Sequence, residues 1–466
     1  VDEVTDEFND VNWLEQNEVY KEIFADIATL LRNNEILTYN ELLEFIRNKE
    51  YNTSKFITDQ NVNDVLDILD RLVDVEVIDA IVPLAVKYGI TVLDNKSGIA
   101  ADYINDFTSE ELNHDFHKLI EIAHKLVDDL DIVTYYIHQF DGDLPLPNEE
   151  VVRLLVDDVF ELNIVIHADG KLATLIYDEI VKRVLKDDQK LIVSADDFAF
   201  DTIDWTSEKE IIREFISIGY DFLEVNNIQN MASVQQLIKE KLYASPAILR
   251  DETGYVLSDA IRVLQNSQLV ENVIEKLYNY GIDFLANSGK VNLPIPIDYL
   301  SGMPKDKLME DLGHVANILD KAVEFGLMEY FADNDIRGLN LELVAQMVED
   351  LYTLNIVKDH DLELLGNIYN YGLKYLEDQT NGTFILTQTQ IDQIDGEQEF
   401  VALANVVRSL QAVIDTGSIH SLGDVMNFIN NKTYKTKEFY AKNVYHAIID
   451  VVNCATDLQL LELITP

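Results

Sequence analysis

The residues of this sequence best suited to hold a metal ion lie in two acidic loops. Both loops contain an Asp-x-Asp turn followed by an Asn and a Glu, and the second set lies 192 positions after the first. The candidate ligands are Asp141, Asp143, Asn148 and Glu150 in the first loop, and Asp333, Asp335, Asn340 and Glu342 in the second. Calcium takes about six to eight hard oxygen ligands, and these side chains supply several of them. Calcium is therefore the candidate ligand of both loops, and no other cofactor is predicted.

A second interpretation gives these loops a structural role. The pattern lacks the glycine and the terminal bidentate glutamate of an EF-hand at the required spacing. In this alternative the loop is solvated and Asn148 or Asn340 caps the helix that follows. Glu150 or Glu342 then lies in the first turn, where the helix dipole favours a negative charge. Both interpretations stay open at the level of sequence.

Three histidines are spaced like metal ligands on one helix, but they do not recur. They are His114, His117 and His124, and the residues 192 positions later are Asp306, Met309 and Ala316. If every copy bound a metal through these residues, the corresponding positions would also hold histidines. They do not, so we predict no metal here and expect surface or boundary histidines.

Two tryptophans also lie 192 positions apart, each just before an expected helix. Trp13 and Trp205 follow an amide or acidic residue, and the third corresponding position holds Gly396. We expect both tryptophans to form an apolar plug where a connector meets a helical bundle. The alternative is a binding role, in which their rings stack on carbohydrate.

No enzyme signature is present, so no catalytic residue is predicted. The sequence lacks GxSxG, GxxxxGK[ST] and HExxH, and its 18 glycines are sparse for a chain of 466 residues. The 85 acidic residues could be paired into hypothetical acids and bases in too many ways to be informative. Cys454 is the single cysteine, so no internal disulfide or cysteine-based zinc site is expected.

The charge balance excludes several classes of partner. Asp and Glu number 85 against 35 Lys and Arg, which gives a formal net charge of −50. Nucleic acid is excluded because phosphate binding needs clustered cations, and anionic membranes are disfavoured for the same reason. No apolar run is long enough for a transmembrane segment. Protein partners or self-association are expected, and mutual repulsion favours an elongated array.

The strongest signal is internal repetition with a period of about 192 residues. Trp13 matches Trp205, Gly89 matches Gly281, and the run beginning at Val156 matches that at Val348, without gaps over nearly the whole first copy. A third, truncated copy begins near residue 384, where Tyr51 and Asp67 match Tyr434 and Asp450. Chance does not hold one register over such lengths.

Half-repeats of about 95 residues are also visible. Similar endings recur at Leu93, Leu185, Leu285 and Leu376, which step by about 95 residues. The apolar spacing within each half is helical, so the expected class is all-α, with helical bundles in tandem. Segments rich in Ile, Val, Phe and Thr near 191–205, 293–297 and 383–396 are expected to be short extended connectors.

These patterns predict five helical bundles. Their expected bounds are 1–97, 98–192, 193–289, 290–383 and 384–466. The function expected from such an array is non-catalytic and structural or adhesive, as part of a larger rod or fibre at the cell surface or outside the cell. The alternatives are a cytoplasmic scaffold that binds protein partners in grooves between helices, and a spacer stiffened by calcium.

Overall fold

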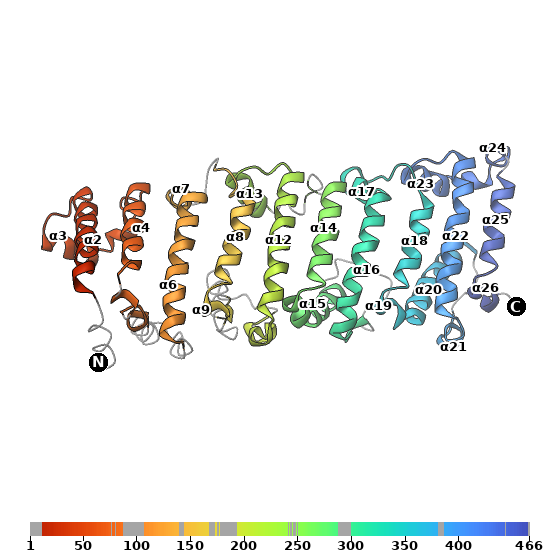
Figure 1. The fold of residues 1–466 in the computed structure, drawn as a ribbon. Helices are drawn as coiled ribbons and strands as arrows, with labels where there is room; N and C mark the ends of the chain where they lie inside the picture. The colour runs from red at the N-terminus through yellow and green to blue at the C-terminus, as the bar shows by residue number, and fades with distance from the viewer. Residues whose placement is uncertain are drawn as a thin grey trace. The chain divides into compact units, whose positions relative to one another are not determined.

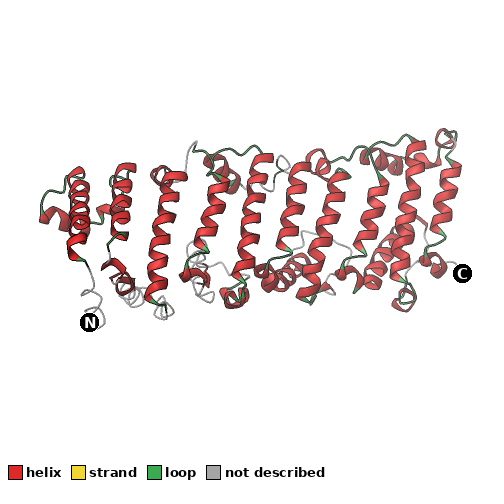
Figure 2. Ribbon diagram, in the orientation of Figure 1, coloured by secondary structure: helices red, strands yellow, loops and turns green. Residues whose placement is uncertain are grey.

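The computed structural model of the chain consists of helices and loops (Figures 1 and 2). It describes residues 12–86, 107–138, 144–166, 193–240, 250–287, 300–380 and 386–464, apart from positions 76, 80 and 443. Residues 173, 174, 177, 242, 245 and 248 are described as well. Within these ranges there is no β-strand, and only two isolated bridges occur, between Pro145 and Asn230 and between Arg337 and Ser421. The chain is therefore all-α, as the helical spacing of its apolar residues predicts.

The chain divides into two compact units. The first unit consists of Val1–Gln189 and Ala199–Glu240, and the second of Lys190–Phe198 and Lys241–Pro466. Each unit is described by itself below.

The first unit is a row of long helices in which each packs on the next. These are α2 (Trp13–Asn33), α4 (Asp59–Val73), α6 (Ser109–His124), α8 (Glu149–Val159) and α12 (Trp205–Val225). The shorter elements are α3 (Tyr39–Arg47), η1 (Glu50–Asn52), η3 (Lys125–Asp129), α7 (Ile132–Ile137), α9 (Asn163–Ile166), η4 (Phe200–Thr202) and α13 (Met231–Lys239). Part of its core joins α2 to α4 and the segment after α4, through Ile23, Ile68, Val75 and Val77.

The second unit also contains a series of helices in which each packs on the next. These are α14 (Asp251–Leu264), α16 (Lys305–Glu324), α18 (Leu341–Leu351), α22 (Gly396–Gly417) and α25 (Tyr445–Ala455). The other elements are α11 (Ala195–Phe198), α15 (Gln268–Asn287), α17 (Leu327–Asp333), α19 (Asn355–Lys358), α20 (Asp361–Thr380), α21 (Gln388–Ile391), α23 (Leu422–Asn430), η7 (Thr433–Lys435), α24 (Lys437–Tyr440) and α26 (Gln459–Ile464). Its largest apolar cluster includes Leu365, Ile391 and Phe400.

Polar caps explain where many of these helices begin. The side chain of Thr38 accepts the backbone N–H of Glu41, whose carboxylate accepts the N–H of Thr38 in return, and Thr108 and Glu111 form the same capping box. Asparagine, aspartate or serine side chains cap several other helices in the same way: Asn148, Asp204, Asn230, Asn340, Asp395 and Ser421.

Several pairs of helices in the described part of the chain have bounds that lie 192 residues apart. This spacing holds at both ends of α2 and α12, of α3 and α13, of α8 and α18, and of α9 and α19. The α9 and α19 helices are also capped alike. The Asp115 carboxylate accepts the N–H groups of Asn163 and Ile164 at 2.7 and 2.8 Å, and Asp311 accepts those of Asn355 and Ile356 at 2.7 and 3.0 Å.

The ungapped 192-residue register predicted from the sequence is wrong within α6 and α16. Asp115 and Asp311 make the same contacts but lie 196 positions apart. The reason is the stretch before these helices, since the N-caps Thr58 and Thr108 are 50 residues apart whereas Arg250 and Pro304 are 54 apart. The π-helical turn η3 at the end of α6 then takes up one residue of the difference.

The extended connectors predicted from the sequence are also wrong where the structure describes them. Residues 195–202 form the short helices α11 and η4, and α21 occupies 388–391. Ser194 binds the Asp197 carboxylate through its N–H and hydroxyl, each at 2.6 Å, and Thr387 pairs with Gln390 in the same manner. These capping pairs favour a helical turn over the extended chain that the β-branched residues suggest. Residues 293–297 lie outside the described ranges.

Helices pack across each of the predicted bundle boundaries. The predicted boundary between residues 97 and 98 lies between α4 and α6, and that between 192 and 193 lies between α8 and α12. The boundary between 289 and 290 lies between α14 and α16, and that between 383 and 384 lies between α18 and α22. The two helices of each pair are in contact. The division into five bundles stays a prediction, but the contacts of the described helices continue from one predicted bundle into the next.

Candidate functional site

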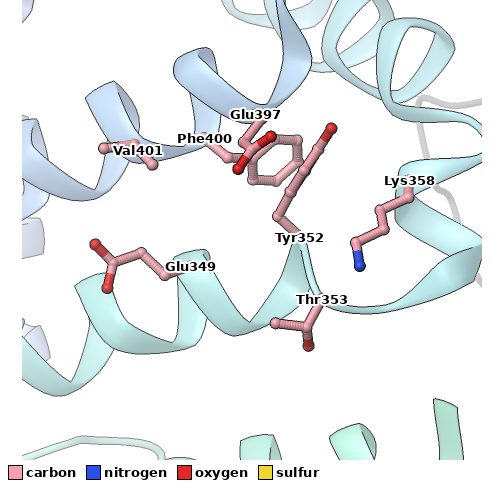
Figure 3. Close-up of a pocket in the computed structure, with 7 residues that line it drawn as sticks. All are labelled: Glu349, Tyr352, Thr353, Lys358, Glu397, Phe400 and Val401. Atoms are coloured by element: carbon pink, nitrogen blue, oxygen red, sulfur yellow. The ribbon is translucent and has the colours of Figure 1, made fainter. Parts of the chain in front are cut away.

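A groove in the second unit lies between the end of α18 with the following α19 on one side and the start of α22 on the other. Its volume is about 350 Å³. Figure 3 shows the residues that line it, which are Glu349, Tyr352, Thr353, Lys358, Glu397, Phe400 and Val401. This volume is close to the lower limit of about 300 Å³ for pockets that take small ligands or single side chains.

Local sequence features place the walls of the groove. The helix α18 ends at Leu351, and Thr353 follows with its hydroxyl donated to the Asp350 carbonyl at 2.6 Å. The next helix, α19, begins where Asp311 caps Asn355. On the other side, the Asp395 carboxylate accepts the N–H of Gln398 and starts α22.

The floor of the groove is aromatic. The rings of Tyr352 and Phe400 have centroids 5.2 Å apart and an interplanar angle of 42°. Phe400 is buried, whereas Val401 beside it is 46% exposed. The Tyr352 hydroxyl donates to Asp361 Oδ2 at 3.3 Å. Burial and, after it, the Asp361 charge raise the pKa of Tyr352, so this phenol stays protonated at neutral pH and is a hydrogen-bond donor rather than a base.

Charged groups surround the apolar floor. Arg408 on α22 donates to both oxygens of Glu349 at 2.8 Å, and it also reaches Glu342 at 3.0 Å. The hydrogen bond from Arg408 lowers the pKa of Glu349. Glu397 and Lys358 complete the charged lining (Figure 3). A groove with an apolar floor and charges at its edge suits an apolar side chain flanked by polar groups.

The corresponding place in the first unit is largely filled. There, Phe160, Ile166, Trp205, Thr206 and Lys209 line a cavity of only about 120 Å³. The Trp205 ring stacks on Phe200 with centroids 6.2 Å apart and also lies 6.1 Å from Phe160. Trp205 is the first residue of α12, whereas the first residue of α22 is Gly396. The tryptophan lines the small cavity of the first unit, whereas Gly396 is not among the residues that line the larger groove of the second.

Gly396 is required by a close approach of the chain. A Cβ atom at this position would overlap the carboxylate of Asp361. That carboxylate is fixed by the Tyr352 hydroxyl and by the N–H of Leu362, which donates to Oδ1 at 2.7 Å. A side chain at residue 396 would therefore displace Asp361 and disturb its hydrogen bond with Tyr352, whose ring forms part of the aromatic floor.

A buried carboxylate precedes the groove residue Phe400 on α22 and links three helices. Glu399 is fully buried and accepts the Tyr369 hydroxyl at 2.6 Å and the N–H groups of Gln459 and Leu460 at 2.8 and 3.3 Å. It thereby ties α20, α22 and the start of α26 together. Burial and Glu399 raise the pKa of Tyr369. With its oxygens engaged by fixed donors, Glu399 holds helices rather than acting as a general base.

The predicted calcium ligands are dispersed among other partners where the structure describes them. Asn148 and Asn340 cap α8 and α18, which matches the structural alternative for both loops. Glu342 pairs with Arg408, and Glu150 lies 3.8 Å from Arg153.

The remaining predicted ligands separate in the same way. Asp335 accepts the N–H of Gly423 at 2.7 Å, and this bond lowers the pKa of Asp335. Asp333 is exposed at the end of α17. Asp141 and Asp143 lie outside the described residues. Across the described ranges, no group of three or more His, Cys, Asp or Glu side chains could hold a metal ion.

The three histidines of α6 do not converge on one point. His124 contacts Asp70 on α4 at 3.0 Å and Asp128 at 3.2 Å, and the bond to Asp70 raises the pKa of His124. His114 lies near Asp115 and Asn163. By the contact register, the residues of α16 that correspond to His114, His117 and His124 are Glu310, Gly313 and Asp320. None is a histidine.

The sequence indicated the groove only indirectly. Neither Tyr352 nor Phe400 was predicted as a site residue, because an aromatic residue at helical spacing indicates a position in the hydrophobic core. The available signal was the replacement of Trp13 and Trp205 by Gly396 in the third copy. The walls of the groove come from residues about 45 positions apart in the chain, so their proximity could not be read from local sequence.

No family model matches the chain, and neither a curated protein nor a solved structure is significantly similar to it. Among the described helices, none combines the length and apolar character needed to cross a lipid bilayer.

Proposed function

We propose that this chain is a non-catalytic helical-repeat protein that binds protein partners in grooves between successive helices. In this proposal the repeat is about 192 residues, the half-repeat about 95 residues, and the helices of one half pack onto those of the next. Support comes from the helix bounds that recur at 192 residues and from the duplicated caps of α9 and α19.

The observation that carries the proposal is the open groove beside Gly396. Its position in the first unit is occupied by the protein's own Trp205, so the second unit offers space for an apolar side chain from outside. An aromatic or large aliphatic residue of a partner fits the floor formed by Tyr352 and Phe400. The net charge of −50 favours partners that bring basic residues beside that anchor.

The structural or adhesive role expected from the sequence is the second candidate. It is favoured by the buried carboxylates Asp115, Asp311 and Glu399, each of which links helices that are 30 or more residues apart in sequence. Such clamps stiffen a helical array. Under this candidate the protein is part of a rod at the cell surface. The calcium-stiffened spacer is a separate possibility, and it alone predicts that calcium raises the melting temperature in a titration.

A peptide-binding measurement tests the groove. The probe is a fluorescein-labelled nine-residue peptide with one central tryptophan flanked by lysines, and binding is followed by fluorescence anisotropy. Val401→Trp fills the groove from its exposed edge, and Leu410→Trp is the matched control because Leu410 is also exposed on α22 but does not line the groove.

The proposal predicts at least tenfold weaker binding to Val401→Trp and unchanged binding to Leu410→Trp. It also predicts that replacing the peptide's tryptophan by alanine abolishes binding. Equal affinity for all three proteins, or binding that depends on the lysines alone, would refute the groove as the binding site.

A further inference from the structure

The helix α25 has one buried and one exposed apolar face. Val444, just before the helix, and Ala447 are buried, and α25 lies beside α22 and is in contact with it (Figure 1). Ile449 and Val452 on the other side are 52% and 55% exposed. Large aliphatic side chains at this exposure leave apolar area in contact with water, which is unfavourable unless another surface covers it.

The corresponding face of α4 is covered. Leu66, which lies 383 positions before Ile449, is 4% exposed. Asp70, one turn later on the same side of α4, contacts His124 of α6. The face of α4 that contains Leu66 and Asp70 is therefore the face that packs on α6.

The corresponding face of α14 is covered as well. Ser258, 191 positions before Ile449, is fully buried, and its hydroxyl donates to Asp320 of α16. Arg262, one turn later, binds the same Asp320 carboxylate. A Cβ added at Gly254 would overlap Val323 of α16, so the two helices approach closely on this side.

From this pattern we propose that the face of α25 formed by Ile449, Val452 and Asn453 is a docking face for one more helix of the kind that α6 and α16 represent. The inference rests on the repeat organisation proposed above. The incoming helix is amphipathic, covers Ile449 and Val452 with its apolar stripe, and places a polar residue opposite Asn453. Asn453 corresponds to Asp70 and Arg262, which meet His124 and Asp320.

The charge of the chain favours such a helix over a second copy of the whole protein. Two chains, each with a net charge of −50, repel one another. A single α6-type helix brings less negative charge, because this segment also contains lysines and histidines such as Lys118, His124 and Lys125.

The test extends the chain by the sequence that follows the corresponding point of the first copy. Pro466 lies 383 positions after Pro83, so residues 84–131, which include α6, are appended after Pro466. Cysteine is introduced in a Cys454→Ser background as Ile449→Cys or as Asp450→Cys. Asp450 is the matched control because it is exposed, and its counterparts Asp67 and Asp259 are exposed too.

The rate of thiol labelling by a maleimide is compared with and without the extension. We expect labelling of Ile449→Cys to slow at least tenfold in the extended chain, while that of Asp450→Cys changes less than twofold. Hydrogen exchange of the α25 amides in the unsubstituted chains provides a second readout that needs no substitution, and it should slow with the extension.

Two results would overturn the inference. One is equal labelling of Ile449→Cys in both chains together with unchanged hydrogen exchange. The other is concentration-dependent protection of Ile449→Cys in the unextended chain, which would identify a second copy as the occupant. Neither result bears on peptide binding at the groove, so the two proposals fail separately.

Discussion

The ring of Tyr352 at the end of α18 packs against the ring of Phe400 on α22, with the centroids 5.2 Å apart. This contact joins two successive helices of the second unit and forms the floor of the groove beside Gly396. In the first unit the position of Phe400 holds Lys209, and Trp205 fills the space instead. One architecture thus supports a filled and an open groove.

Phe400→Ala should destabilise the second unit by about 3–5 kcal/mol, since it removes a buried aromatic side chain and leaves a cavity. Urea denaturation followed by circular dichroism measures the loss. The control is Val401→Ala on the same helix, which should cost less than about 1 kcal/mol because Val401 is half-exposed. Equal losses for the two variants would contradict the buried position of Phe400.

Gly396→Ala should lower the free energy of unfolding by about 1 kcal/mol or more, although alanine favours helix. The new methyl group would displace Asp361 and break its bond with Tyr352. Gly281→Ala on α15 provides the comparison, because no atom beyond its chain neighbours and its own helix backbone lies within 4 Å of the added Cβ. It should be neutral or stabilising by up to about 1 kcal/mol. A stabilising effect at both glycines in thermal denaturation would refute the close approach.

Asp115→Ala and Asp311→Ala should cost similar amounts, about 2–3 kcal/mol each, because each leaves two or more N–H groups at a helix start without their acceptor. Asp306→Ala, an exposed position on α16, should change stability by less than about 0.5 kcal/mol. Hydrogen exchange at Asn163 and Asn355 should speed up only in the matching variant. A large cost at one aspartate alone would argue against equivalent roles.

The ion pair of His124 with Asp70 should be sensitive to pH. The pKa of His124 in the folded chain is raised, chiefly by its bond to Asp70, above the ordinary value of 6.5. Its stabilising contribution is therefore complete below the unfolded pKa and is lost as the pH rises through the raised folded pKa.

Because the pair is partly exposed, this contribution should stay below about 1 kcal/mol. An NMR titration of the His124 ring should give a lower pKa in Asp70→Asn than in the native chain, and an unchanged value would contradict the contact. The corresponding Arg262 and Asp320 pair should show no change across the same pH range, because the guanidinium does not titrate there.

The helical class could be read from the sequence because apolar residues recur at helical spacing throughout. The bounds of α2 and α12 follow the predicted 192-residue period, since a repeated pattern folds alike wherever its length is conserved. The register of α16 could not be read, because four added residues before it leave the apolar pattern helical while moving Asp311 into the place of Asp115. A helix tolerates such a shift since four residues are close to one turn.

The site was less predictable than the fold. The capping roles of Asn148 and Asn340 were visible as one of two alternatives, because an asparagine before a helix has a local signature. The groove has no local signature, since Tyr352 and Phe400 meet only through tertiary packing between α18 and α22. The helical turns α11 and α21 were missed because β-branched residues outweighed the Ser194–Asp197 and Thr387–Gln390 capping pairs.

The position of the bound anchor side chain is the most direct test of binding in the groove. Nuclear Overhauser contacts are measured between the indole of the lysine-flanked tryptophan peptide and the native protein. We predict contacts from the peptide indole to the rings of Tyr352 and Phe400 and to the methyl groups of Val401. Contacts to other surfaces, with none to these three residues, would contradict binding in the groove between α18 and α22.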